Sequence, residues 1–301
     1  MKRIKLFLPI IAGFTLFSCS DYLDVNTSPN SPNEIQVTPN LSLAAAQSDS
    51  YRVIAQRMNE YGNVFMNNWG ANINSFTGGY AEEFGITVSN NFYDDIWNTT
   101  YLNMGEYTKI INHPSTIHDN HKAIAKILKS YYFQYIVDLY GDVPYSQAFQ
   151  GIDNLTPGYD DDQAIYRDLI VQLDSAIDMI NNAPSTTIAV GSEDVMLSGN
   201  MNNWIKVANT LKLRILLRQA TKAETDGATA TYLDDQFAVL DNNFINFDFT
   251  SINNNFSPSL AATRLTGIPV ICAITSATFS SVTVNFCFFE SSSQAAFDCS
   301  N

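Results

Sequence analysis

The sequence predicts an all-α protein, and three observations support this fold class. Apolar residues recur at spacings of three and four along several stretches of about twenty residues, as in amphipathic helices. Polar or acidic residues precede some of these stretches, and Gly or Pro follows them, as at helix boundaries. The stretch 41–61 is dense in helix-favouring Ala, Leu, Gln, Arg and Met.

The N-terminal segment has the features of a signal peptide. Basic residues lie among the first five positions, and the apolar run 6–17 follows. This run is too short to cross a bilayer, which needs about 20 residues. The run ends in the sequence LFSC at 16–19, which resembles a bacterial lipobox, so Cys19 is the predicted lipidation site. The alternative is an ordinary secretory peptide with a chance Cys nearby.

Composition limits the partners of the chain. The 301 residues carry 16 Lys+Arg against 30 Asp+Glu, a formal net charge of −14. Nucleic-acid binding through phosphate neutralisation needs basic surfaces, so we expect no nucleic-acid partner. Up to residue 271 the only cysteine is Cys19, so the body does not depend on disulfides.

The chain divides into four predicted segments. Residues 1–18 form the signal peptide, and 19–40 form the acylated Cys with a flexible tether rich in Asn, Pro and Asp. Residues 41–258 form the helical domain. Residues 259–301 have few charges and no helical period; they form an irregular tail, either a β-like extension or the product of a shifted reading frame.

Within the domain, the patterns predict six helices. They cover 41–61, 92–112, 121–140, the stretch after the acidic run 160–162 to about 181, 201–222 and about 231–241. Residues 67–91 lack a helical period and are interpreted as a long loop. Gly141 and Pro144 end the third helix. The fifth helix is apolar around much of its circumference, so we expect it to pack on more than one side.

Four segments of the chain stand out: CSDYLDVNTSPNSP from Cys19, YDDIWNTTYLNM at 93–104, YYFQYIVDLYGDVPYSQAFQG at 131–151 and WIKVANTLKLRILLRQA at 204–220. They resemble the SusD/RagB family of outer-membrane lipoproteins of Bacteroidota, more narrowly its SusD-like branch. The LYGDVPYSQA part is the most specific. The resemblance covers about residues 1–258, and family members are usually much longer. The chain therefore resembles the N-terminal half of a member, truncated after about residue 258 and followed by an atypical tail.

The resemblance implies a fold of tetratricopeptide-like helix pairs, an α-α superhelix. It also implies a lipoprotein on the outer face of the outer membrane that is no enzyme and has no cofactor. Such a protein binds a nutrient, most often an oligosaccharide, and delivers it to a SusC-like TonB-dependent transporter. Ser20, Asp21 and Asp24 are similar to the surface-export signal of such lipoproteins.

The candidate ligand-binding residues are Trp69, Asn72, Phe76 and Tyr80, in the Asn-rich and Gly-rich loop. An aromatic ring beside amide side chains can stack on a sugar and pair with its hydroxyls. These aromatics, and Phe84 with them, could equally hold the long loop against the helices. Trp97 and Tyr101 lie at helical spacing and are interpreted as core residues.

Other polar groups have structural interpretations. His113, His118 and His121 fit a polar loop before the third helix better than a metal site. The acidic loop 153–162 fits helix capping better than calcium binding. We expect Arg214 and Arg218 to pair with carboxylates such as Asp138 or Asp142.

Three other functions remain as alternatives. One is a peptide-binding member of the same family, and another is a non-functional truncated fragment. A surface glycosidase would need two carboxylates on opposite sides of a sugar, and the adjacent pairs Glu82–Glu83 and Asp94–Asp95 do not stand out from other acidic residues.

Overall fold

The structure is a computed structural model, and it describes residues 36–70 and 80–245. Cys19, most of the predicted tether and the predicted tail 259–301 lie outside the described residues. Within the described ranges the protein is helical, as predicted, and its one β-bridge joins Val143 to Asp160. None of the described helices is both long enough and apolar enough to cross a membrane.

The first predicted helix is longer and less regular than expected. Helix α2 spans Pro39–Arg52 and starts two residues before the predicted boundary. A π-helical turn, η1, spans Val53–Met58, and α3 spans Asn59–Phe65. Pro39 can begin α2 because the first helical position needs no N–H donor.

The predicted loop at 67–91 is partly helical, which corrects the sequence interpretation. Helix α4 spans Ala81–Gly85, with Glu82 and Glu83 in its first turn, where acidic side chains favour the positive end of the helix dipole. Only one turn long, it has no room for the apolar period by which helices are recognised in a sequence. Helices α5 (Asp94–Asn112) and α6 (Asp119–Tyr140) then follow within two residues of prediction.

The remaining predicted helices are present. They are α7 (Asp162–Asn181), α8 (Met201–Arg218), the short α9 (Ala220–Ala223) and α10 (Gly227–Val239); a 3-10 turn, η2, spans Gly151–Asp153. The predicted fifth helix breaks at Gln219, so α8 and α9 replace one continuous helix.

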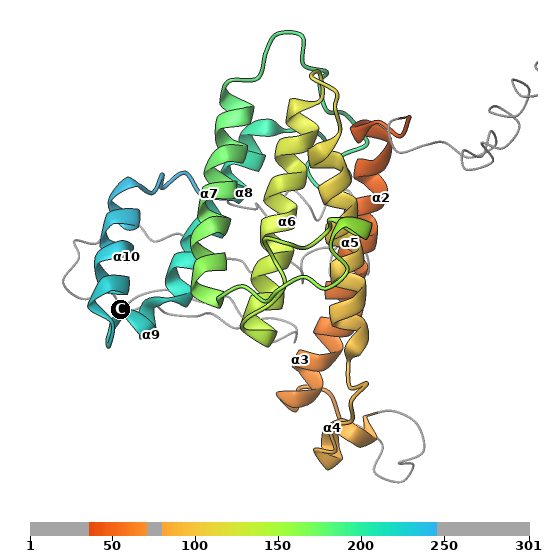
Figure 1. The fold of residues 1–301 in the computed structure, drawn as a ribbon, viewed down its shortest axis with the longest axis vertical. Helices are drawn as coiled ribbons and strands as arrows, with labels where there is room; N and C mark the ends of the chain where they lie inside the picture. The colour runs from red at the N-terminus through yellow and green to blue at the C-terminus, as the bar shows by residue number, and fades with distance from the viewer. Residues whose placement is uncertain (1–35, 71–79, 246–301) are drawn as a thin grey trace, which may run out of the picture.

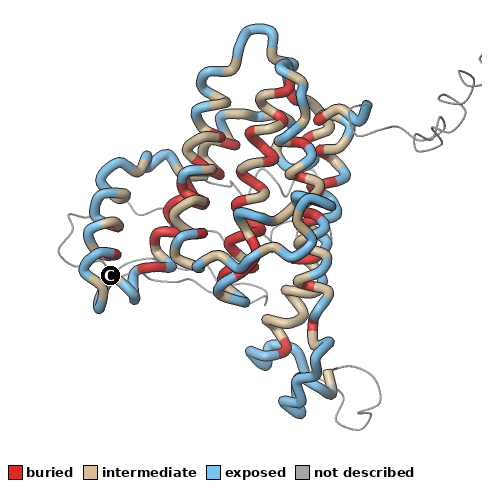
Figure 2. Tube along the Cα trace, viewed as in Figure 1, coloured by how far each residue is buried: buried red, intermediate tan, exposed pale blue. Residues whose placement is uncertain are grey.

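Helix α6 lies at the centre of the bundle. It contacts α2, α5, α7 and α8, and Figure 1 shows α5, α6 and α7 side by side with α3 and α4 projecting from one end. Buried residues concentrate along α6 and on the helix faces turned toward it (Figure 2). As expected, α8 packs on several sides, against α6, α7 and α10. Trp97 and Tyr101 pack against the core, as predicted.

The two arginines of α8 take different partners. Arg218 forms an ion pair with Asp138 at 3.1 Å, as predicted. Arg214 contacts tyrosines instead of a carboxylate: it donates a hydrogen bond to the hydroxyl of Tyr135 (3.3 Å) and lies over the rings of Tyr131 and Tyr135. The expected acidic partner of Arg214 is therefore wrong, because aromatic faces of α6 meet α8 at that point.

Asp194 joins α2 and α8 to its own loop through a buried carboxylate. Only 1% of this residue is exposed. Its carboxylate accepts hydrogen bonds from the Gln47 amide of α2 (2.9 Å) and from the indole N–H of Trp204 in α8 (2.7 Å). The backbone N–H groups of Met196, Leu197 and Gly199 also donate to it. A buried charge is stabilised when it is fully hydrogen-bonded in this way.

Gly199 closes this loop at a place where a side chain has no room. Its φ is +74°, and a Cβ there would lie 2.0 Å from the carbonyl oxygen of Val190. The loop can therefore bring the Gly199 N–H to Asp194 only because glycine occupies the position.

We predict that Asp194→Asn destabilises the whole bundle. The amide nitrogen would face at least two of the buried N–H donors, and each donor left without an acceptor costs about 1–3 kcal/mol. The free energy of unfolding, measured by urea denaturation, should fall by about 3 kcal/mol or more. Asp178→Asn, at an exposed position of α7, is the control and should change it by less than about 0.5 kcal/mol. Equal effects of the two substitutions would contradict this role of Asp194.

Candidate functional site

The projecting end of the bundle carries a cluster of aromatic rings, which we name the aromatic tip. Its members come from α3, α4 and the chain leading into α5: Tyr61, Phe65, Tyr80, Phe84, Phe92 and Tyr93. Tyr61 lies 4.9 Å from Phe65 and 5.2 Å from Tyr93 between ring centroids. Such edge-on and tilted pairs stabilise beyond simple burial by about 0.5–1.5 kcal/mol each.

Polar contacts attach the tip to the bundle. Arg57 of η1 pairs with Asp95 of α5 and with Glu60, and its guanidinium lies 4.8 Å from the centroid of the Tyr93 ring. The Tyr93 hydroxyl donates to Glu83 of α4 at 2.7 Å. Burial and the Glu83 carboxylate raise the pKa of Tyr93 well above its usual value, so this hydroxyl remains a donor.

Left-handed backbone positions shape the tip. Tyr80, Ile86 and Tyr93 have φ values of 65°, 51° and 51°, which cost residues with a Cβ about 1–2 kcal/mol each. Tyr93 starts α5 from this conformation while its ring is buried among Tyr61 and Phe92. Aromatic packing therefore offsets the backbone cost and fixes the direction in which the chain enters α5.

Apolar side chains of the tip and beside it are exposed. The exposed fractions are 39% for Trp69, 70% for Met66, 38% for Phe84 and 78% for Ile86. Trp69 lies just after α3, where its backbone N–H donates to the carbonyl of Asn63 at 3.2 Å. Its indole ring is therefore anchored through the backbone and accessible from outside.

Two of the four predicted ligand-binding residues lie within the described chain. Trp69 is exposed, and Tyr80 belongs to the tip, with its ring centroid 6.4 Å from that of Phe84. Asn72 and Phe76 lie outside the described residues, so the four-residue site stays a prediction. The sequence interpretation did not identify Tyr61, Phe92 or Arg57. Arg57 and Tyr61 belong to helical turns before the loop and Phe92 to the turn before α5, so they meet the loop only through folding.

The carboxylates considered for hydrolysis have structural partners here. Glu83 accepts from Tyr93, and Asp95 pairs with Arg57. One member of each adjacent pair therefore holds the tip together, and neither pair offers two free carboxylates.

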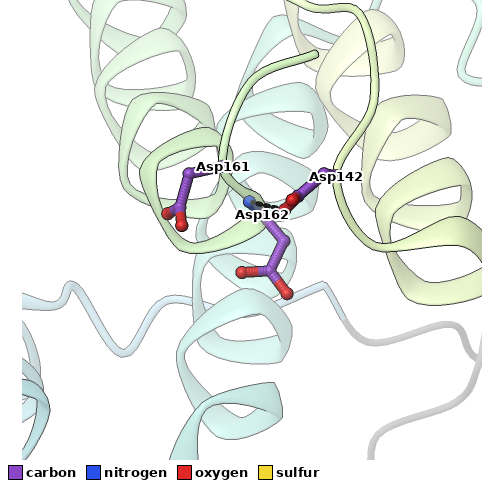
Figure 3. Close-up of side chains that lie close together, drawn as sticks. All are labelled: Asp142, Asp161 and Asp162. Carbon is purple, nitrogen blue, oxygen red and sulfur yellow. Dashed lines mark hydrogen bonds between the residues drawn. The ribbon is translucent and has the colours of Figure 1, made fainter.

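A group of three carboxylates lies at the start of α7. Oxygens of Asp142, Asp161 and Asp162 lie within 4.8 Å of one another, and Figure 3 shows the Asp142 side chain against the backbone of Asp162. Asp142 accepts from the Asp162 N–H at 3.0 Å, and Asp161 caps α7 by accepting from the Ala164 N–H at 2.9 Å. Helix capping therefore accounts for this part of the acidic loop, as predicted.

The three histidines gather at the N-terminus of α6. His113 and His118 lie in the loop before α6, as predicted, and His121 lies in the first turn of α6. His118 and His121 are buried, with 4% and 0% exposed. His121 pairs through Nε2 with Glu193 at 3.0 Å, and His118 Nδ1 lies 2.6 Å from the Ser115 hydroxyl. Burial, together with the neighbouring His121 and His113, lowers the pKa of His118.

We predict that His118 makes the fold sensitive to acid. Because its pKa is lower in the folded state, the unfolded chain binds more protons below about pH 6.5, and stability falls as pH falls through that region. In His118→Gln, the decrease of the thermal midpoint between pH 7 and pH 5 should be smaller than in the wild type. His113→Gln removes a half-exposed imidazole that is only a lesser cause of this pKa shift, so it should reduce the decrease less than His118→Gln does. Equal slopes in the two variants would contradict the prediction.

These features define an all-α scaffold of packed neighbouring helices with an aromatic projection, and known proteins share this scaffold. A SusD/RagB family protein from Bacteroides thetaiotaomicron VPI-5482 is similar with a TM-score of 0.57 and 23% identity, over 70% of this chain and 43% of that one. A SusD-like protein of Bacteroidetes AC2a gives 0.55 and 22%, over 71% and 38%. A chitin-binding protein gives 0.54 and 25%, over 70% and 44%.

The family model of SusD-like proteins, described as "Starch-binding associating with outer membrane", matches residues 29–279. The chain therefore belongs to this SusD-like family, as its sequence motifs predicted. It spans less than half of the length of the solved structures just described. No curated protein matches the chain.

Proposed function

We propose that this protein is a cell-surface lipoprotein that binds a glycan nutrient and delivers it to a SusC-like TonB-dependent transporter in the outer membrane. The observation that carries the proposal is the family match over residues 29–279, under a description that names starch binding and the outer membrane. Cys19 is the proposed lipid anchor. The ligand would be bound without chemical change, so the protein is proposed not to be an enzyme.

The exposed ring of Trp69 and the rings of the aromatic tip support a carbohydrate ligand. Sugar C–H faces pack on aromatic rings, while hydroxyls pair with amides and carboxylates. A similar solved structure is a chitin-binding protein, and the description of the matching family names starch binding. Chitin oligosaccharides and starch oligosaccharides are therefore the first ligands to test.

We predict that Trp69→Ala weakens glycan binding while leaving the fold intact. Loss of one stacking face should weaken affinity by about 10-fold, measured by titration calorimetry with chitin and starch oligosaccharides. Because Trp69 is exposed, the thermal midpoint without ligand should stay close to that of the wild type. Tyr159→Ala removes an exposed aromatic of the segment between η2 and α7, outside the aromatic tip; this variant is the control and should bind as the wild type does.

Two outcomes would decide against the proposal. Binding of peptides but of no glycan would favour the peptide-binding alternative. Release of reducing ends from a glycan by the wild-type protein would favour the glycosidase.

The same protein samples test whether the chain is a non-functional fragment. A ligand that binds the native state alone should raise the thermal midpoint, so a midpoint that no ligand raises would favour the fragment.

A further inference from the structure

A second feature lies away from the aromatic tip, in a pocket of about 210 Å³ between α6, α7 and the segment that follows α6. We name it the lysine pocket. Its lining includes the polar and aromatic residues Lys126, Lys129, Phe133, Tyr145, Ser146 and Gln172.

The two ammonium groups of the lysine pocket keep free N–H donors. Lys126 donates to the side-chain oxygens of Gln172 (3.3 Å) and Ser175 (2.9 Å), both neutral. Lys129 lies 4.8 Å from the centroid of the Phe149 ring, and no oxygen of the described residues accepts a hydrogen bond from it. An ammonium has three N–H donors, so one of Lys126 and three of Lys129 are available.

Nearby carboxylates do not neutralise these lysines by direct contact. Asp168 accepts hydrogen bonds from the Tyr145 hydroxyl and the Gln172 amide. Asp160 accepts from the backbone N–H groups of Tyr145 and Ser146 and from the Ser146 hydroxyl. By contrast, Lys212 of α8 pairs directly with Asp174 at 2.5 Å.

The environment disfavours the charge on Lys129 in the absence of an anion. Burial, with the nearby Lys126 ammonium as a second cause, lowers the pKa of Lys129 to about 8. Burial lowers the pKa of Lys126 as well. An anion placed between the two groups would relieve both effects, because an opposite charge favours the charged form of an amine.

We propose that the lysine pocket binds a compact oxyanion of the carboxylate, sulfate or phosphate class. Such a group offers several acceptor oxygens for the free N–H donors, and charge-assisted hydrogen bonds are the strong ones. The pocket volume of about 210 Å³ far exceeds the ~10–15 Å³ that one water molecule needs, which leaves room for the oxyanion and part of the molecule that carries it. An acidic substituent on the glycan is one source of the anion, and this reading rests on the proposed function; a free inorganic ion is the other.

The test is a calorimetric titration of sodium sulfate into the purified chain at pH 7, with ionic strength held constant by chloride. Sulfate should bind with a saturable isotherm, and Lys126→Gln and Lys129→Gln should each weaken it by about 10-fold or more. Lys222→Gln removes an exposed lysine of α9 and should bind as the wild type does. Absence of saturable binding, or equal weakening in all three variants, overturns the proposal.

A further variant separates anion binding from folding. Lys129→Met keeps an apolar chain against Phe149 and removes a charge that burial disfavours, so its thermal midpoint without sulfate should match or exceed that of the wild type. Its sulfate affinity should still fall, and unchanged affinity overturns the proposal. Wild-type affinity should also fall from pH 7 to pH 9.5 as Lys129 loses its proton. The other titratable groups in or beside the pocket are Lys126, Tyr145, Asp168 and Asp160.

Comparison of glucuronate, glucose and sulfate identifies the source of the anion. Glucuronate binding that exceeds sulfate binding and depends on Lys129, with no binding of glucose, assigns the pocket to acidic glycans. Sulfate binding that exceeds glucuronate binding assigns it to an inorganic ion. If the wild-type protein binds glycans at Trp69 but binds no anion, this inference alone is overturned. If it binds an anion but no glycan, only the proposed function is overturned.

Discussion

The bundle depends on one buried carboxylate, that of Asp194. Gln47 and Asp194 are 147 positions apart in the sequence, and their hydrogen bond holds α2 against the loop that leads into α8. Trp204, fully buried, gives its indole N–H to the same carboxylate. Apolar packing alone permits helices to slide or rotate, whereas a carboxylate with five N–H donors is satisfied in one arrangement. Asp194 therefore fixes how α2 and α8 are positioned relative to each other, whereas packing against α6 only brings the two helices close together.

Local sequence patterns predicted the helices well, because their causes are local. The boundaries of α6 follow from its apolar stripe, from Gly141 at φ +73° and from Pro144 just beyond. The start of α7 follows from the capping side chain of Asp161. The Asp194 network could not be predicted in this way, since an acidic residue in a polar loop has the sequence pattern of a solvated surface.

The candidate site was predictable only in part, for a related reason. Trp69 and Tyr80 stood out because aromatic residues in a polar, Gly-rich segment need an explanation. The contacts that hold the tip, Arg57 with Asp95 and Tyr93 with Glu83, join helices at separations of 38 and 10 positions. The left-handed backbone at Tyr93 is equally hidden, because a tyrosine carries no signal for it and only the packing of its ring maintains it.

The lysine pocket can bind an anion although the chain as a whole is strongly acidic. The chain is strongly acidic, yet at physiological salt the field of exposed carboxylates decays within about 8 Å. Affinity for an anion is therefore decided by the groups that touch it. Helix α6 carries lysines at helical spacing, at positions 122, 126 and 129. This pattern is typical of a solvent-exposed helix face. The segment after α6 brings Phe149 and Tyr145 over that face, and this return of the chain turns two ordinary lysines into a partly desolvated pair. Desolvation costs the fold some stability when the pocket is empty, and it strengthens each hydrogen bond to an anion that enters.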